Sequence, residues 1–273
     1  MAGSVADRQT AVVVPGVSPD VFPWDKYPLP RFLYKYFPPE RLHVLTQCLI
    51  RFSQRQVFED VYDLRPDVAS FGNEDAMLEF MADNPALSRH PPWLREAAAK
   101  HVLSTPGREA ALIRQTQEWL TEPDNLGVLC LTENPASGRM WEQYTDAGHG
   151  FVVAFDTAHP TFIHLRSPGR IGKVEYTDEP VPDFLTRYGM NVYFQKRTQY
   201  EFEAEWRSIR GFSRFQPENI RHPKDALPIY LAPFNPACIA TILIRSQCTV
   251  EWALRTLTAI DTRYRHVRVE FSR

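Results

Sequence analysis

Apolar or aromatic side chains alternate with charged ones over eight residues, Tyr200-Glu201-Phe202-Glu203-Ala204-Glu205-Trp206-Arg207. A period of two is typical of a β-strand, whereas the side chains of an α-helix repeat every 3.6 residues. Read as a strand, the stretch places three glutamates and Arg207 on one face and the aromatic side chains on the other. Three neighbouring carboxylates repel each other unless water, a cation or a ligand offsets their charge. The charged face is therefore either an ordinary solvated sheet face or the wall of a site, and both interpretations stay open.

The rest of the chain divides into an N-terminal arm and one domain. Residues 1–30 contain five prolines and show no sustained periodicity, which predicts a disordered or loosely packed arm. Residues 31–273 are expected to form a single domain, with three helices between about 73 and 121 as an insert. Strands are expected at 31–36, 49–53, 127–132, 150–156, 171–176, 201–209, 240–244 and 266–271, and further helices at 40–48 and 250–260. This pattern predicts an α+β fold, with a mixed, largely antiparallel sheet and a helical insert.

Composition narrows the class of protein. The chain has 273 residues, of which 44% are hydrophobic, and its net charge is -2. This balance argues against a dedicated nucleic-acid or membrane-surface protein. The longest apolar run, 237–244, is far shorter than the roughly 20 residues needed to cross a bilayer. The N-terminus does not resemble a secretory signal, and the four cysteines lack the close pairs of a zinc site. We therefore expect a cytoplasmic protein with no membrane partner and no metal.

Four short motifs follow one another along the chain. They are Leu33-Tyr34-Lys35-Tyr36; Phe52-Ser53 with Phe58-Glu59-Asp60; Met140-Trp141-Glu142-Gln143-Tyr144, followed by Gly150 and Phe155-Asp156; and Glu203-Ala204-Glu205-Trp206-Arg207. Together they resemble a bacterial family catalogued as domain of unknown function 2971, over roughly residues 33–260 without the helical insert. The chain departs from the family pattern with Glu59 in place of asparagine, Val61 in place of proline, and Arg245 where glycine is frequent. The family is uncharacterised, so the resemblance implies a type of domain and almost no activity.

The order of these elements is also similar to the ADP-ribosyltransferase plan. That plan has a strand with polar side chains that hold the ligand, then a helix, a second strand that ends in serine, and a late strand with glutamate-x-glutamate. Its late glutamate stabilises the positive charge that develops on the nicotinamide ribose. The similarity implies NAD as a substrate, Glu205 as the catalytic residue and Glu203 as its assistant. The remaining implied roles are binding of the dinucleotide by Tyr34 or Lys35 and Ser53, and stacking of Tyr144 or Trp141 on nicotinamide.

The residues themselves suggest acid/base chemistry near Glu203. On a strand, Glu203 and Glu205 would lie about 6.6–7 Å apart and could grip two parts of one ligand, such as the hydroxyls of a ribose. Burial and like charge would raise the pKa of one carboxyl, while Arg207 would lower that of the other. Such a split suits an acid/base pair. Lys35 is either a phosphate contact or a surface lysine. Trp141 and Tyr144, three residues apart, either stack on a flat ring or pack in the core.

Two other classes of function stay open. The chain has only 12 glycines and no glycine-rich phosphate loop, nucleophile-elbow serine or paired-cysteine ligand set, which disfavours nucleotide kinases, Rossmann dehydrogenases, serine hydrolases and zinc enzymes. One alternative is a non-catalytic module that binds a nucleotide, RNA or protein, in a bacterial stress or phage-defence system. The other is a metal-dependent hydrolase with Glu201, Glu203, Asp156 and His149 as hard ligands. The main expectation is an NAD-using transferase that modifies a protein or nucleic acid.

Overall fold

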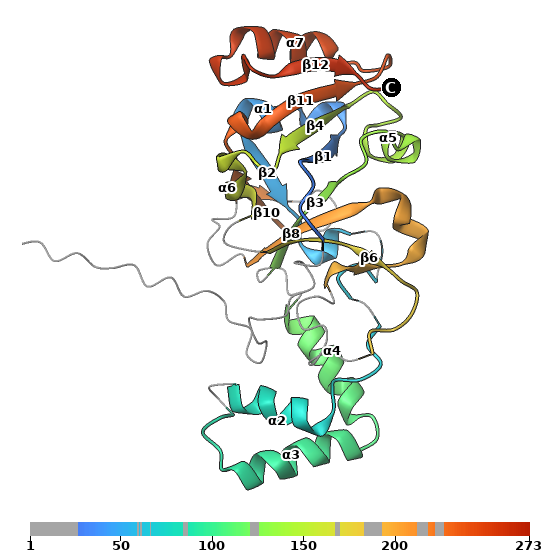
Figure 1. Cartoon of the computed structure of the whole chain (residues 1–273), viewed down its shortest axis with the longest axis vertical. Coiled ribbons are helices and arrows are strands. Elements are labelled where there is room, and N and C mark those ends of the chain that lie inside the picture. Colours follow the sequence, from blue (N-terminus) through green and yellow to red (C-terminus); the bar gives the residue numbers. More distant parts are fainter. Residues whose placement is uncertain are drawn as a thin grey trace, which may run out of the picture.

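The computed structural model describes residues 27–58, 60, 62–65, 67–83, 87–120, 126–166, 170–182, 193–211, 218–221 and 227–273. The expected N-terminal arm lies outside these ranges except for residues 27–30. Figure 1 shows the large sheet in the upper part of the molecule and three helices below it. None of the described helices is long and apolar enough to cross a membrane.

A seven-stranded sheet forms the centre of the fold. Its strand order is β12 (Arg268–Phe271), β11 (Ile239–Ile244), β4 (Phe151–Asp156), β1 (Phe32–Phe37), β3 (Leu126–Thr132), β8 (Glu205–Gly211) and β5 (Arg170–Lys173). All neighbouring strands are antiparallel except β11 and β12, which are parallel. The predicted α+β class, with a mixed and largely antiparallel sheet, is therefore confirmed.

The remaining described strands form two smaller sheets. The first has the order β2 (Leu49–Phe52), β10 (Pro228–Pro233) and β9 (Glu218–Arg221). The second pairs β6 (Glu175–Tyr176) in parallel with β7 (Gln195–Lys196). The predicted strands at 49–53 and 171–176 contain β2 and β6, but β7, β9 and β10 are not predicted, because none of these three segments alternates apolar with polar residues.

Helices occupy both the predicted insert and the connections between strands. The insert contains α2 (Glu74–Asp83), α3 (Pro92–Ser104) and α4 (Arg108–Leu120), and Figure 1 shows all three below the sheet. The other α-helices are α1 (His43–Gln47), α5 (Gly138–Tyr144), α6 (Ile163–Arg166) and α7 (Glu251–Ile260). Short 3₁₀ helices span Pro39–Leu42, Arg55–Val57, Pro160–Phe162, Thr198–Glu203, Pro236–Cys238 and Thr262–Tyr264. The expected helix at 40–48 is thus a 3₁₀ turn followed by α1.

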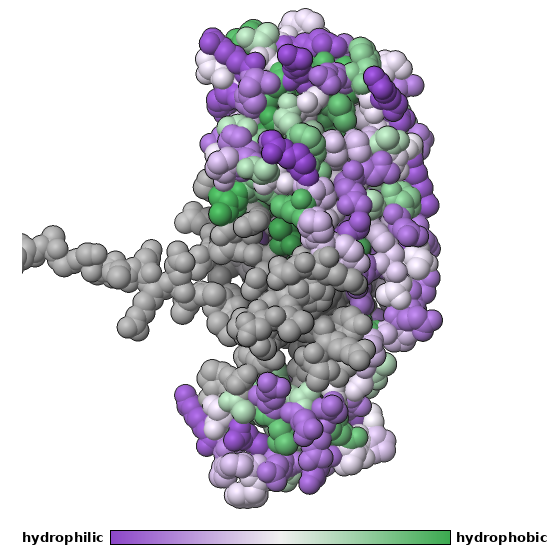
Figure 2. Space-filling model, in the orientation of Figure 1, coloured by the Kyte–Doolittle hydropathy of each residue, from purple (hydrophilic) through white to green (hydrophobic). Residues whose placement is uncertain are grey.

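Three apolar clusters hold these layers together. The largest joins the central strands to the β2–β10 sheet and to α7, and includes Leu33, Phe52 and Trp206. A second joins the helical insert to β3 and β8 through Met77, Val128 and their neighbours. A third lies under α5. Figure 2 shows hydrophilic residues over most of the visible described surface, with apolar residues in small separate groups.

Gly150 allows a close approach of two backbone segments at the start of β4. A Cβ atom at this position would lie 2.0 Å from the backbone oxygen of Phe37, the last residue of β1. Replacing Gly150 with Ala must therefore push β1 and β4 apart, and we expect the free energy of unfolding to fall by about 2–3 kcal/mol. Gly138→Ala is the matched control, because nothing lies within 4 Å of a Cβ there. Urea unfolding that finds both variants equally stable would contradict the close approach.

Candidate functional site

Glu203 and Glu205 approach each other from two different elements. Glu203 is the last residue of the 3₁₀ helix Thr198–Glu203, and Glu205 is the first residue of β8. Ala204, between them, has a left-handed backbone with φ 42° and ψ 51°, a conformation that costs roughly 1–2 kcal/mol in a residue other than glycine. The expectation of a strand across 201–209 is therefore wrong for its first four residues. The 3₁₀ helix turns the carboxyl of Glu203 toward that of Glu205.

Both carboxylates are buried. Glu203 is 4% exposed and Glu205 is 3% exposed, whereas Glu201 lies at the surface. The solvated-face interpretation thus holds for Glu201 and fails for the other two glutamates. Polar contacts with the end of β3 hold the turn in place, because the Thr132 hydroxyl donates to the Glu203 carbonyl over 2.6 Å.

Lys196 of β7 lies between the carboxylates. Its Nζ is 2.6 Å from Glu203 Oε2, 3.2 Å from Glu205 Oε2 and 3.4 Å from Asp63 Oδ2. The ring of Tyr200 covers the ammonium from one side, with 4.7 Å between Nζ and the ring centroid. One lysine therefore connects two neighbouring glutamates to Asp63, which is distant in the sequence.

Arg207 provides the second buried cation. Its guanidinium is inaccessible to solvent and donates to Glu205 Oε1 over 2.8 Å, to Asp63 Oδ1 over 2.6 Å and to the backbone oxygen of Tyr193 over 2.7 Å. Asp63 is itself only 2% exposed. We call Asp63, Lys196, Glu203, Glu205 and Arg207 the charge cluster. With every group ionised, two cations face three carboxylates, so the charge cluster has one excess negative charge.

The surroundings of the two glutamates push their pKa values in opposite directions. Burial and the charge of Glu205 raise the pKa of Glu203 above its ordinary value of 4.5, although Lys196 and Tyr144 counteract this. Burial alone would also raise the pKa of Glu205, but Arg207 and Lys196 outweigh it and hold the pKa well below 4.5. The split that the sequence predicts is thus present, with Glu203 as the carboxyl that takes up a proton more readily.

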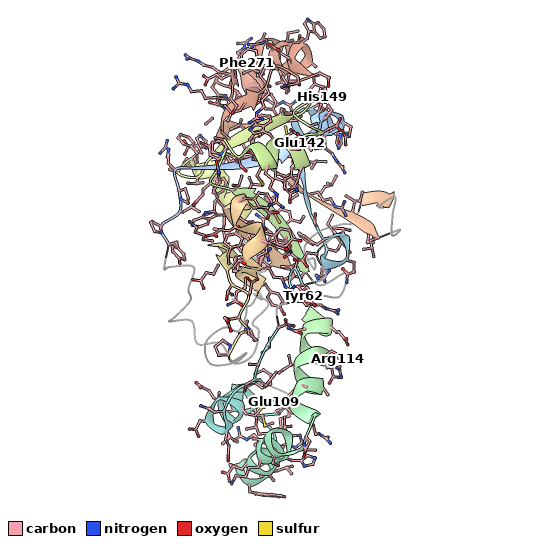
Figure 3. All side chains as sticks on the ribbon, turned by 90° about the vertical axis from the view of Figure 1, so that its right-hand side faces the viewer. Tyr62, Glu109, Arg114, Glu142, His149 and Phe271 are labelled. Carbon is pink, nitrogen blue, oxygen red and sulfur yellow. The ribbon has the colours of Figure 1, made fainter. Side chains whose placement is uncertain are left out.

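Tyr144 connects Glu203 to the surface. It is the last residue of α5, its side chain is 42% exposed, and its hydroxyl donates to Glu203 Oε1 over 2.7 Å. Burial, followed by the charge of Glu203, raises the pKa of Tyr144, so the phenol keeps its proton. Figure 3 looks onto the side of the molecule that carries α5, with Glu142 on that helix and Tyr62 where the sheet meets α4.

Lys35 lies beside the charge cluster without an ion pair to it. Its Nζ donates to the backbone oxygen of Cys130 over 2.8 Å. The Cys130 thiol in turn hydrogen-bonds to Glu205, and burial raises the pKa of that thiol. The structure therefore brings Glu203, Glu205, Tyr144 and Arg207 together and places Lys35 next to them.

The other expected ligand contacts lie elsewhere. Trp141 is fully buried, its Nε1 donates to the Pro135 oxygen over 2.9 Å, and its ring packs edge-on against Tyr36. The prediction that Trp141 stacks on nicotinamide is therefore wrong, because no face of the Trp141 ring is accessible. Tyr34 packs partly buried against the same apolar cluster. Ser53 pairs through its backbone with Val128, at the junction of β2 and β3.

Sequence periodicity does not identify Asp63, Lys196 or Tyr176 as residues of the site. Asp63 lies in a loop next to Leu64, whose φ is 60°, and Lys196 belongs to a strand of two residues. The Tyr176 hydroxyl accepts a hydrogen bond from the Glu205 backbone nitrogen over 2.7 Å. Once the structure shows that Arg207 is buried, buried acidic partners are expected for it, because a buried cation is otherwise unfavourable.

Within the described residues, no three His, Cys, Asp or Glu side chains are arranged to hold a metal ion. In the charge cluster, the Lys196 ammonium occupies the position between the carboxylates. Of the ligands expected for a metal-dependent hydrolase, Asp156 pairs with Arg31, His149 contacts the Gln247 oxygen, Glu201 lies at the surface and Glu203 is buried.

The lowered pKa of Glu205 predicts a loss of stability in acid. Below pH 4.5 the unfolded chain protonates this carboxyl while the folded chain keeps it ionised, so the free energy of unfolding must fall as pH decreases. The slope contributed by one such group approaches about 1.4 kcal/mol per pH unit. Urea unfolding as a function of pH measures it, and Glu205→Gln should flatten the acid limb whereas Glu201→Gln, at the surface, should not. Equal acid limbs in the two variants would contradict the assignment.

Comparison of the chain with protein-family models, curated proteins and solved structures finds no match in any of the three.

Proposed function

We propose that the protein is a nucleotide-linked transferase that cleaves the bond between nicotinamide and ribose in NAD, with Glu203 as the carboxyl that meets the substrate. One observation carries this proposal. Two carboxylates of one charge cluster have their pKa values pushed apart, and only Glu203 is hydrogen-bonded to a half-exposed side chain, Tyr144. Pairs of carboxyls with divergent pKa values are typical of acid/base catalysis.

The chemistry requires a negative charge near the ribose and an acceptor for one proton. When the bond from the ribose carbon to the nicotinamide nitrogen breaks, its electron pair stays on nicotinamide and positive charge develops on the ribose. An ionised Glu203 stabilises that charge. The acceptor's oxygen or nitrogen then bonds to the ribose carbon and passes its proton to Glu203. A carboxyl with a raised pKa is the better base for this step, because its proton affinity is closer to that needed near neutral pH.

The identity of the substrate rests on the resemblance of the sequence motifs to the ADP-ribosyltransferase plan, from which the structure departs in placing Glu203 on a 3₁₀ helix rather than on the late strand. That similarity implies Glu205 as the catalytic residue. We propose instead that Glu205 is a positioning residue, because its carboxylate pairs with both Arg207 and Lys196 and, unlike that of Glu203, has no hydrogen bond to a half-exposed side chain in the described part of the chain. Its role would be to hold Lys196 and Arg207 in place and to keep the pKa of Glu203 raised through like charge. Tyr144 would orient the Glu203 carboxyl through its hydrogen bond.

The direct test uses NAD labelled in the nicotinamide ring. Incubation with the intact chain should release free nicotinamide slowly with water as the acceptor, and faster when proteins or nucleic acids are added as acceptors. Absence of nicotinamide release under all of these conditions would overturn the proposed function. A non-enzymatic nucleotide-binding module would bind NAD and leave the bond intact.

A further inference from the structure

Arg139 stacks on the residue that precedes Glu203. It lies at the surface in the first turn of α5, the helix that ends at Tyr144. Its guanidinium carbon lies 3.8 Å from the centroid of the Phe202 ring. Phe202 directly precedes Glu203, and consecutive Cα atoms are only about 3.8 Å apart. The arginine is thus held against the segment that carries the reactive carboxyl.

The support under the arginine is rigid. Phe202 packs against the apolar cluster of Tyr36, Met140, Trp141 and Val152, of which Trp141 is fully buried. Stacking on an aromatic face fixes the plane of a guanidinium and leaves its N–H donors at the edge free to point outward. Phe202 therefore orients the donors of Arg139.

No described residue pairs with those donors. Within the described part of the chain, the guanidinium of Arg139 stacks on Phe202 but forms neither a hydrogen bond nor an ion pair. Some other exposed arginines do have a carboxylate partner, namely Arg31 with Asp156 over 2.7 Å, Arg255 with Glu251 over 2.8 Å and Arg263 with Asp261 over 2.6 Å. A planar, pre-oriented arginine without a carboxylate matches the geometry of a phosphate group.

We propose that Arg139 binds a phosphate of the substrate, on the solvent side of Glu203. This inference rests on the proposed function for the identity of the ligand and adds to it a residue that contacts the pyrophosphate. Binding there would place the adjoining ribose near Tyr144 and Glu203, because α5 lies against the 3₁₀ helix Thr198–Glu203, with Arg139 contacting Phe202 and Tyr144 contacting Glu203. The proposal therefore commits the site to a nucleotide with at least one phosphate.

Arg245 provides a matched control. Its guanidinium also lies over an aromatic ring, 4.8 Å from the centroid of Trp141, but it follows β11 and stacks on a ring that belongs to the core. Arg139→Gln and Arg245→Gln thus remove the same chemical group and the same type of stacking. Only the first removes a cation that is packed on the neighbour of Glu203.

The experiment measures binding of ADP-ribose, inorganic pyrophosphate and adenosine to the intact chain by calorimetry. We expect the parent protein to bind ADP-ribose, and Arg139→Gln to weaken that binding about tenfold to a hundredfold, the loss typical of hydrogen bonds to a charged group. Adenosine, which has no phosphate, should bind the parent and Arg139→Gln equally. Arg245→Gln should bind ADP-ribose like the parent. Arg139→Lys should have an intermediate affinity, because lysine keeps the positive charge but lacks the paired N–H donors of the guanidinium.

Two results would overturn the phosphate contact. One is a parent protein that binds neither ADP-ribose nor pyrophosphate, and the other is an Arg139→Gln variant that loses no more affinity than Arg245→Gln. These outcomes differ from failure of the proposed function. If NAD is cleaved but Arg139→Gln leaves its KM unchanged, only the phosphate contact fails. If ADP-ribose binds through Arg139 but NAD is not cleaved, only the reaction fails.

Discussion

Replacing Glu203 with Gln is expected to lower the rate of NAD cleavage about 10²–10⁴-fold, the range usual for loss of a general acid or base. Glutamine has nearly the same shape, and its amide oxygen can still accept a hydrogen bond from Tyr144, but it takes up no proton and carries no charge to stabilise the ribose. Steady-state measurement of nicotinamide release gives the effect. The loss should appear in kcat, because the missing interaction is made in the transition state.

The same substitution should leave the protein folded. Because burial raises the pKa of Glu203, its ionised form is unfavourable in the native state, and a neutral side chain removes that cost above pH 4.5. Glu201→Gln is the matched control, since Glu201 lies in the same 3₁₀ helix but at the surface. If Glu203→Gln cleaves NAD as fast as Glu201→Gln does, Glu203 is not the reactive carboxyl.

Replacing Arg207 with Met is expected to lower the free energy of unfolding by about 3–5 kcal/mol. The reason is the burial of its partners: Asp63 is 2% exposed and Glu205 3%, so both would lose their guanidinium without gaining water. Lys196 would then face three carboxylates alone. Urea unfolding monitored by tryptophan fluorescence measures the change.

An exposed ion pair supplies the comparison for Arg207. Arg31 pairs with Asp156 but its side chain is 62% exposed, so Arg31→Met should cost less than about 1 kcal/mol. The double variant Arg207→Met with Glu205→Gln should lose less free energy of unfolding than the sum of the two single losses. The reason is that Glu205→Gln removes a carboxylate that Arg207→Met has left without its guanidinium. Additive losses would mean that the two side chains act independently, contrary to the contacts described above.

Local periodicity predicts the large sheet and the helical insert well. The strands near 127–132 and 150–156 and the helix at 108–120 contain enough residues for their apolar pattern to identify them. The same rule fails at 201–204, where the alternation continues but the chain forms the end of a 3₁₀ helix and the left-handed turn at Ala204. The end of β3 contacts the backbone around Ala204 there, and contacts between distant segments do not leave a local pattern.

The candidate site could be predicted only in part for the same reason. Glu203, Glu205, Arg207 and Tyr144 lie in motifs that stand out along the chain. Asp63 and Lys196 reach the charge cluster from a loop and from a strand of two residues, and their role depends entirely on the packing of β8 against distant segments. Asp63 and its partner Arg207 are 144 residues apart in the sequence, and a local pattern does not encode a contact over that separation.

The most direct test of the proposed site is a titration of the Glu203 carboxyl, followed by the carbon-13 resonances of labelled glutamate side chains with and without ADP-ribose. We predict one resonance with a midpoint above pH 4.5 that is absent from Glu203→Gln, and whose midpoint shifts when ADP-ribose binds. A Glu203 carboxyl that titrates at or below 4.5 and does not respond to ADP-ribose would contradict its assignment as the reactive group.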